Sequence, residues 1–181
     1  MFLVSSNRRK LAEIEEFGLA LDLKAGLDLP EVAGTPDEVA CYKALAAGPG
    51  AVVEDTILVI DGEPVVDIRW RLAELNERHD LAAEWMVSLG HHAEHEIRLY
   101  RGVLTGRLQV PSAPPPPDAF GFDPYFVPEG ETRSLHELAA LGLKAHYSAR
   151  RLAVEHLLRG QPDRVWTVAS LPPWTGAYQN S

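Results

Sequence analysis

The amino-acid sequence predicts a mixed α/β fold, in which a central mixed sheet is flanked by helices. Strand-like and helix-like stretches alternate along the chain, with hairpins between them, which is the pattern of this fold class. Hydrophobic residues make up 46% of the chain and charged residues 24%, which is typical of a globular protein and not of a disordered one. With 181 residues, the chain forms one domain with its own core or two closely packed lobes.

The first third of the chain predicts two strands and two helices. Residues 2–5 (FLVS) form a short buried strand that runs into a polar turn, and from Lys10 apolar residues recur at helical spacing. A cap-like Thr35 followed by a proline begins the second helix, and the GPG sequence at 48–50 ends it. AVVEDTILVID (51–61) is the strongest strand signal. Two acidic residues inside this apolar run are costly unless a site uses them.

The rest of the chain predicts further helices and strands. Residues 67–89 carry two helices, around IRWRLAELN and LAAEWMVSL, and EIRLYRG and VLTGRLQV form the strands of a hairpin. PSAPPPPD (111–118) is a stiff polyproline-like loop that cannot pair in a sheet. FGFDPYFVP then forms a turn and a strand, and HELAALGLKAHYSARRLAVEHLLRG forms two helical pieces. One more strand is predicted within RVWTVAS (164–170).

Charge and cysteine content exclude several classes of protein. Seventeen basic and 26 acidic residues give a net charge of −9, which argues against binding to a nucleic-acid backbone. A small polyanionic substrate remains possible, since a few local cations and a metal ion can bind one. Cys41 is the only cysteine, so no intrachain disulfide can form and a reducing cytoplasm is expected. No apolar run has the length of a membrane span, so no membrane partner is expected.

The turn SSNRRK, which follows the first strand, is a candidate phosphate-binding site. A strand that ends in small polar residues and opens a helix presents free backbone N–H groups and the positive end of the helix dipole. Ser5, Ser6 and Asn7 supply the polar residues, and Lys10 adds a cation. The alternative is a simple helix cap, and the glycines and Lys-Ser/Thr pair of a Walker loop are absent.

Acidic residues form the second candidate group. They are Glu31, Glu38, and Glu54 with Asp55, followed by Thr56. Carboxylates near a phosphate site suit Mg²⁺, which takes oxygen ligands and bridges to phosphates, and one of them could deprotonate an attacking water. The alternative for Glu31 and Glu38 is that they are solvated charges at helix ends.

The third candidate group lies near the end of the chain. FGFD (120–123) places an aromatic ring beside a glycine, and Lys144, Ser148 and Arg150 follow in KAHYSARR. A ring can stack on a base while Asp, Lys and Arg contact its edge. The alternative is a turn with a core phenylalanine and a basic helix start.

Taken in order, these segments resemble the inosine triphosphate pyrophosphatase family over about residues 1–158. VSSNRRKLAEI is similar to the family's T-G-N-x-x-K-x-x-E opening, and DLPEVAGTPDEVACYKA resembles the segment that supplies an acidic residue and a second-helix lysine. VVEDTILV resembles the metal and base segment. FGFDPYFVPEG and KAHYSARRLA resemble the F-G-(Y/W)-D-P-x-F and K-N-x-x-S-H-R motifs.

The resemblance implies an activity and a set of roles. It implies a single domain over 1–181, with two lobes and the active site in the cleft between them, in which an NTP is hydrolysed to NMP and pyrophosphate with Mg²⁺. Asp55 would be metal ligand and general base, with Glu31 and Glu54 as further acidic ligands. Phosphates would be bound by Ser5, Ser6, Asn7, Lys10, Lys43 and Thr56. The base would be bound by Phe120, Gly121, Phe122, Asp123, Lys144, Arg150 and Arg69. A cytoplasmic homodimer is also implied.

The sequence departs from the family pattern at the base-binding motif. Ala149 stands where the family has the histidine of S-H-R, and losing a polar contact to the base should blunt or move base discrimination. His146 lies three residues earlier, but Ser148 has the character of an N-cap, so His146 is expected to precede the helix. Two alternatives to the purine NTP pyrophosphatase therefore stay open: a catalytically weak nucleotide-binding protein and a pathway-specific nucleotide pyrophosphohydrolase.

Two further departures concern strands. Between Leu89 and Gly102 the chain is expected to hold one strand where the family has a hairpin. Residues 160–181 are expected to extend beyond the usual end of the family. The strand within 164–170 could then add to the shortened sheet, with Trp166 and Trp174 packing it down; the alternative is a surface tail or a dimer contact.

Overall fold

The computed structural model describes residues 1–5, 7–25, 29–65, 80–111, 114, 115, 119 and 121–179. Several predictions lie outside these residues: the roles of Ser6, Arg69 and Phe120, the helix around IRWRLAELN, and much of the proline-rich loop. The chain divides into two compact units. The first comprises Met1–Thr56, Val87–Gly102 and Arg150–Ser181, and the second comprises Ile57–Met86 and Val103–Ala149. The predicted cleft between lobes stays a prediction.

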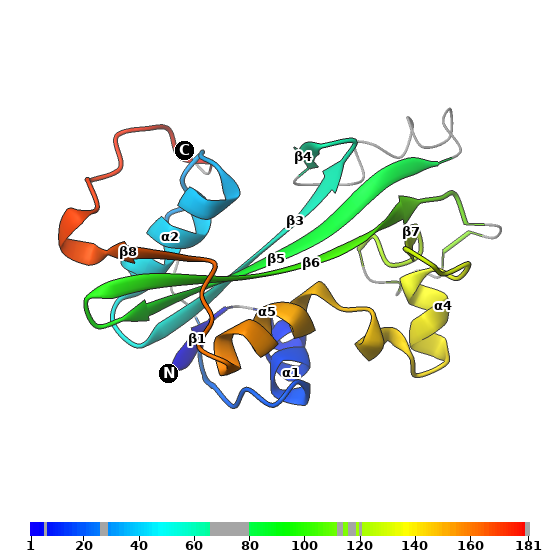
Figure 1. Ribbon diagram of the computed structural model, residues 1–181, viewed down its shortest axis with the longest axis horizontal. Helices are drawn as coiled ribbons and strands as arrows, with labels where there is room; N and C mark the ends of the chain where they lie inside the picture. The colour runs from blue at the N-terminus through cyan, green and yellow to red at the C-terminus, as the bar shows by residue number, and fades with distance from the viewer. Residues whose placement is uncertain are drawn as a thin grey trace. The chain divides into compact units, whose positions relative to one another are not determined.

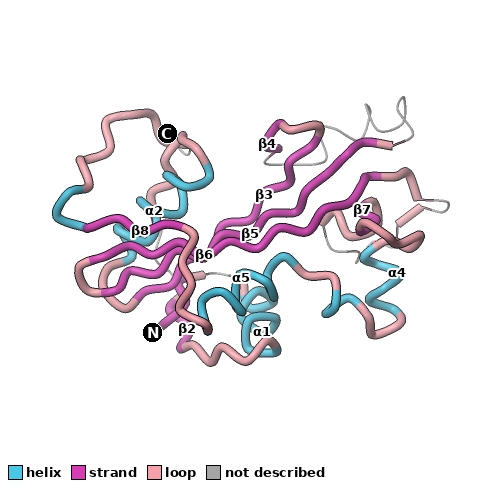
Figure 2. The backbone as a smooth tube through the Cα atoms, viewed as in Figure 1, coloured by secondary structure: helices cyan, strands magenta, loops and turns pink. Residues whose placement is uncertain are grey.

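The described strands form one mixed sheet, as predicted (Figures 1 and 2). Its order is β2 (Asp22–Lys24), β1 (Phe2–Val4), β3 (Ala51–Ile60), β5 (Leu81–Ala93), β6 (Glu96–Leu108) and β7 (Phe126–Pro128). Strand β4 (Glu63–Val65) pairs with β3, and β8 (Arg164–Thr167) pairs with β6. Strand β1 runs parallel to β2 and β3, whereas β4, β7 and β8 run antiparallel to their partners.

The helices begin at the caps that the sequence indicates. Asn7 caps α1 (Arg8–Glu16), and Thr35 forms a capping box with Glu38 at the start of α2 (Pro36–Ala47). The backbone amide and hydroxyl of Thr35 donate to Glu38 and lower the pKa of its carboxyl group, which favours the helix-end role for this residue. The later elements are α4 (Leu135–Ala140), the 3-10 turn η2 (Lys144–His146), α5 (Ala149–Leu158) and η3 (Val168–Ser170).

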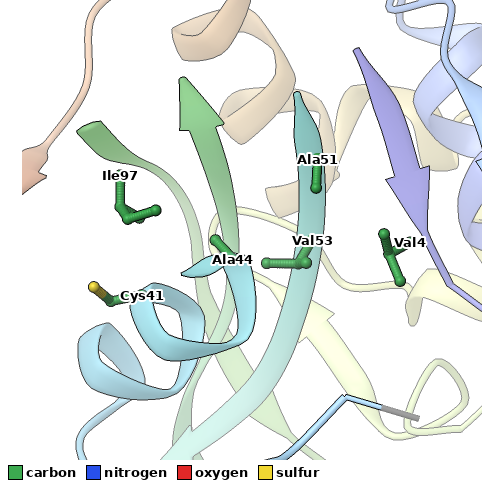
Figure 3. Close-up of a cluster of buried hydrophobic side chains, with 6 residues drawn as sticks. All are labelled: Val4, Cys41, Ala44, Ala51, Val53 and Ile97. Carbon is green, nitrogen blue, oxygen red and sulfur yellow. The ribbon is translucent and has the colours of Figure 1, made fainter. Parts of the chain in front are cut away.

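A cluster of buried side chains joins α2 to the sheet within the first unit (Figure 3). Its members are Val4, Cys41, Ala44, Ala51, Val53 and Ile97. Most of these side chains are small, which allows the helix to approach the strands closely. Burial raises the pKa of the Cys41 thiol to about 11, so this cysteine stays protonated and packs as a small apolar residue.

Helix α2 approaches the sheet closely at Gly90 of β5. A Cβ atom there would lie 2.7 Å from the carbonyl oxygen of Ala40 and 3.1 Å from the Cβ atom of Ala44, both on α2. We therefore expect Gly90→Ala to lower the free energy of unfolding by about 1–3 kcal/mol, because the helix must shift to make room. Thermal or urea unfolding measures this loss. Ala82→Val, on the exposed side of the same strand, is the control, and an equal effect in both variants would contradict the packing argument.

Two predictions between residues 81 and 108 are wrong. LAAEWMVSL is not a helix but the start of β5, where Leu81, Ala83 and Trp85 are buried and alternate with exposed residues. Leu, Ala, Glu and Met favour helices, but pairing within the sheet overrides that weak preference. EIRLYRG and VLTGRLQV are not two strands either: both belong to β6, which continues through Gly102.

The expected loss of the family hairpin is also wrong. Residues 89–102 contain the end of β5, the two-residue connection at Glu94 and His95, and the start of β6. Strands β5 and β6 are hydrogen-bonded neighbours and therefore form this hairpin. Glu94 adopts a positive φ of 44°, the left-handed conformation that tight turns require.

The predicted strand near the end of the chain is confirmed. Strand β8 pairs antiparallel with the start of β6, from Glu96 opposite Thr167 to Leu99 opposite Arg164. Trp166 packs against the buried cluster around α2. Trp174, in contrast, packs on Tyr42 of α2, with ring centroids 5.2 Å apart. In the part of the chain that the structure describes, no helix is long and apolar enough to cross a bilayer.

Candidate functional site

The turn between β1 and α1 carries the predicted phosphate-binding residues. The amide of Asn7 donates to the Ser5 hydroxyl oxygen at 3.0 Å, and the amide of Arg9 donates to Asn7 Oδ1 at 3.0 Å. Lys10 lies in the first turn of the helix, with Nζ 3.4 Å from Oε1 of Glu54. The small polar residues therefore shape a helix cap, and the lysine brings a partly exposed cation to the same end of α1.

Glu54 is the centre of a buried ion cluster. Its side chain is 1% exposed, and Arg150 binds both of its oxygens, through Nη2 to Oε1 at 3.0 Å and Nε to Oε2 at 3.2 Å. The Thr56 hydroxyl and the Lys10 ammonium group also contact Oε1. Arg150 pairs in addition with Glu13 of α1. The cluster therefore links β3, α1 and α5.

Opposing effects fix the ionisation of this cluster. Burial by itself would raise the pKa of Glu54, but the charges of Lys10 and Arg150 and the hydrogen bonds to its oxygens outweigh burial and lower it. For Arg150, burial would lower the pKa, and the carboxylates of Glu54 and Glu13 raise it instead. Both groups stay charged. Their contacts place both in one buried ion cluster, and the metal-ligand role of Glu54 and the base-edge role of Arg150 stay predictions.

The pleat of β3 separates its two adjacent acidic residues. Successive side chains of a strand point to opposite faces of the sheet. Val53 packs against α2, Glu54 faces Arg150 of α5, and Asp55 turns back towards Lys43 of α2. In Figure 1, α2 lies on one side of β3 and its neighbouring strands, and α1 and α5 lie on the other side. The side chains of Glu54 and Asp55 therefore point to different faces of the sheet, although the two residues are neighbours in sequence.

On the α2 face, one lysine joins two carboxylates. Lys43 Nζ lies 2.7 Å from Oε1 of Glu31 and 3.9 Å from Oδ1 of Asp55. All three side chains are partly exposed, by 16%, 34% and 20% respectively. Burial raises the pKa of Asp55, the cations of Lys43 and Lys10 oppose that rise, and the nearby carboxylates of Glu31 and Glu54 add to it. Asp55 is therefore a stronger base than an ordinary aspartate.

The donor set on this face fits Mg²⁺ shared with a substrate. Among the described residues, no group of three or more His, Cys, Asp or Glu side chains could hold a metal ion by itself. Glu31 and Asp55 nevertheless place two carboxylates beside the ammonium group of Lys43. Magnesium is commonly held by one or two carboxylates together with substrate phosphates and water. The arrangement fits that kind of site and not a closed structural metal site.

The second unit contains the described part of the predicted base-binding group. Gly121 adopts a positive φ of 52° in the turn before β7. Phe122 packs edge-on against Trp85, with ring centroids 5.7 Å apart, and against Phe126 at 5.8 Å. Trp85 was missed by sequence reasoning because its segment was predicted as a helix. The available signal was the alternation of apolar residues at Leu81, Ala83, Trp85, Val87 and Leu89.

Asp123 and Lys144 form the polar part of this unit's group. Lys144 Nζ donates to Asp123 Oδ2 at 2.5 Å, and the two side chains are 22% and 9% exposed respectively. Ala149, at the position of the absent histidine, is fully buried at the start of α5. His146 is exposed in η2 and precedes α5, as predicted.

Glu13 is a further residue to which sequence reasoning assigned no function. It occurs in the opening motif, three residues after Lys10. Its contact with Arg150 comes from a segment 137 residues further along the chain. The motif spacing was the only signal for its role, because the partner is remote in sequence.

Comparisons with known proteins find relatives of this chain by sequence and by structure. A family model described as the Ham1 family matches residues 1–160. The chain is similar to an inosine triphosphate pyrophosphatase of Tuber melanosporum, with 30% identity over 168 residues, 81% of this chain and 89% of the relative. It is also similar to a dITP/XTP pyrophosphatase of Deinococcus deserti, with 31% identity over 162 residues, 75% of this chain and 77% of the relative.

Two solved structures share the fold. The Ham1 protein of Staphylococcus aureus superposes with a TM-score of 0.66 at 19% identity, covering 89% of this chain and all of that one. A HAM1 protein from Coxiella burnetii gives a TM-score of 0.62 at 24% identity, covering 88% of this chain and 98% of that one. The predicted α/β class with a mixed sheet is confirmed.

Proposed function

The chain belongs to the Ham1 family, and we propose from this membership and the site geometry that it hydrolyses non-standard purine nucleoside triphosphates to the monophosphate and pyrophosphate. Relatives named inosine triphosphate and dITP/XTP pyrophosphatase support this substrate class. The observation that carries the proposal is the position of Lys43 between the carboxylates of Glu31 and Asp55. This position brings together a cation that can bind phosphate and two carboxylates that can bind a metal ion, and a metal-assisted reaction at a phosphate requires both.

In the proposed reaction, water attacks the α-phosphorus and the bond from that phosphorus to the bridging oxygen breaks. Pyrophosphate leaves with the bonding electrons. Asp55 orients the water and takes its proton as the general base. Lys10 and Lys43, together with the amides at the start of α1, bind the phosphate oxygens.

We propose Mg²⁺ as the cofactor, with Asp55 and Glu31 as its protein ligands. When bound, it would neutralise charge on the triphosphate, which is the main requirement of phosphoryl-transfer chemistry. Glu54 would hold Lys10 and Arg150 in place from the opposite face of β3. Its carboxylate is 1% exposed and already contacts Arg150, Lys10 and Thr56, whereas Glu31 and Asp55 are 34% and 20% exposed, so the metal is assigned to Asp55 and Glu31.

For the base, we propose that Phe120 stacks on the ring and that Asp123 and Lys144 contact its edge. Gly121 and Phe122 shape the turn that carries Asp123. Ala149 offers no polar atom where the family motif has histidine, so we propose weaker discrimination between 6-oxo and 6-amino purines than that histidine would give. We further propose that the enzyme acts in the cytoplasm as a homodimer, without a nucleic-acid or membrane partner.

A substrate screen tests the proposed function. With Mg²⁺ present, we expect pyrophosphate release from ITP, XTP and dITP, and a smaller preference over the 6-amino purine ATP than a site with the histidine would show. Pyrimidine triphosphates and a reaction without divalent metal are the controls. Hydrolysis of none of the triphosphates would contradict the proposal and favour the nucleotide-binding alternative. A strong preference for ITP or XTP would contradict the role assigned to Ala149.

A further inference from the structure

The segment Leu171–Gln179, which we call the strap, follows η3 and lies outside the residues that the Ham1 family model matches. In Figure 1 it is the red segment that follows the helical turn after β8 and loops to the beginning of α2. It belongs to the same unit as α2, Glu31 and Asp55. Its contacts fall on both sides of the Lys43–Glu31 pair.

The first set of contacts is with α2. The Tyr42 hydroxyl donates to the carbonyl oxygen of Pro172 at 2.9 Å, and the Trp174 ring packs edge-on against the Tyr42 ring. Trp174 also covers Gly34, where a Cβ atom would lie 3.0 Å from the indole ring. The strap is therefore fixed to the residue next to Lys43.

The second set of contacts is with the backbone that carries Glu31. Val32 and Tyr178 form an antiparallel bridge, and the amide of Ala33 donates to the carbonyl oxygen of Ala177 at 2.9 Å. The amide of Gln179 donates to the carbonyl oxygen of Glu31 itself at 2.8 Å. The Gln179 side-chain amide donates to the carbonyl oxygen of Val32 at 3.0 Å.

Through these contacts, the strap constrains the chain at both members of the Lys43–Glu31 ion pair. The Glu31 carboxylate is 34% exposed, so a long side chain must be ordered where water competes for it. Hydrogen bonds that fix its backbone reduce the entropy lost when the carboxylate binds a cation. A segment that served only to cover α2 would not need to bond the Glu31 carbonyl.

We propose that the strap is a positioning element that holds Glu31 beside Lys43 and Asp55, where its carboxylate serves as a ligand of a divalent cation. This inference rests on the proposed function, since it takes Glu31 as a ligand of the metal that accompanies the triphosphate. Residues of the strap act through Glu31 and do not contact the reacting atoms.

A double-mutant cycle tests the strap. The full chain, a chain ending at Ser170, Glu31→Gln, and the shortened chain with Glu31→Gln are compared by calorimetric titration with Mn²⁺, without nucleotide. We expect the Kd for Mn²⁺ to rise about tenfold when the strap is removed from the parent, and less than about twofold in the Glu31→Gln background. Equal rises in both backgrounds, or no rise in the parent, would overturn the proposal.

Single substitutions keep the test decisive if the shortened chain does not fold. Gln179→Pro removes both the amide that donates to Glu31 and the side chain that donates to Val32, whereas Gln179→Ala keeps the amide. We expect the proline variant to bind Mn²⁺ several-fold more weakly than the alanine variant, at an unchanged Tm. Equal affinities would contradict the positioning role.

Catalysis supplies an independent readout. In ITP hydrolysis, removing the strap should raise the Mg²⁺ concentration for half-maximal rate about tenfold and change kcat at saturating Mg²⁺ by less than about threefold. A fall in kcat alone would point to a merely structural role and overturn the inference. If the full chain hydrolyses no triphosphate, the proposed function fails, while the Mn²⁺ cycle still decides whether the strap positions Glu31.

Discussion

Asp55→Asn is expected to lower kcat for ITP hydrolysis by about a thousandfold or more, with little change in the Tm. The substitution keeps the shape of the side chain but removes the group that we propose as the general base, for which effects of about 10²–10⁴ are usual. It also removes one of the two proposed carboxylate ligands of the metal. The rate of pyrophosphate release at saturating ITP and Mg²⁺ measures the effect.

Asp61→Asn is the matched control for this prediction. Asp61 lies in the turn that follows β3, and replacing it with asparagine makes the same chemical change there. Its positive φ of 50° is a conformation that asparagine also adopts readily. We expect this variant to hydrolyse ITP within about twofold of the parent rate, as for a surface substitution away from the site. A near-normal rate in Asp55→Asn would refute the assignment of this residue as base and ligand.

Arg150→Ala is expected to give the largest loss of stability. Its guanidinium group is 4% exposed and binds Glu54, whose carboxylate is 1% exposed. Removing one partner of a buried ion pair leaves the other charge in the interior and costs about 3–5 kcal/mol. For a chain of this size that corresponds to a fall of about 6–20 °C in the Tm, which differential scanning calorimetry measures.

Arg159→Ala is the control for the charge itself. Arg159 pairs with Glu155 at 3.2 Å near the end of the same helix, but its side chain is 59% exposed. An exposed pair of this kind contributes at most about 0.5 kcal/mol. A similar, small shift in both variants would mean that the Glu54 cluster does not hold β3, α1 and α5 together.

The difference between Glu54 and Asp55 illustrates the limits of sequence reasoning at this site. The apolar run around the two residues indicates a strand, and a strand alternates its side chains between two faces. The sequence therefore contains the reason why the two carboxylates separate. It does not indicate which face meets α2 and which meets α5, because Arg150 lies 96 residues from Glu54 along the chain.

The prediction of a helix over LAAEWMVSL failed for a related physical reason. Local preferences for helix are worth only tenths of a kcal/mol per residue, whereas a strand between β3 and β6 gains hydrogen bonds along two edges. Burial alternates at Leu81, Ala83 and Trp85 because the strand packs one face against other residues. The partners that decide this lie outside any short window of sequence.

The sequence by itself determined the features that short segments of chain encode. The strand predicted at 51–61, observed as Ala51–Ile60, and the helix start at the cap-like Thr35 could be predicted, since neighbouring residues determine them. Tertiary structure alone decided that Glu54 pairs with Arg150, that β5 is a strand, and that the strap bonds the backbone of Glu31. These contacts join residues that are far apart in the chain. They stabilise the protein only when the folded chain buries and pairs both partners at once.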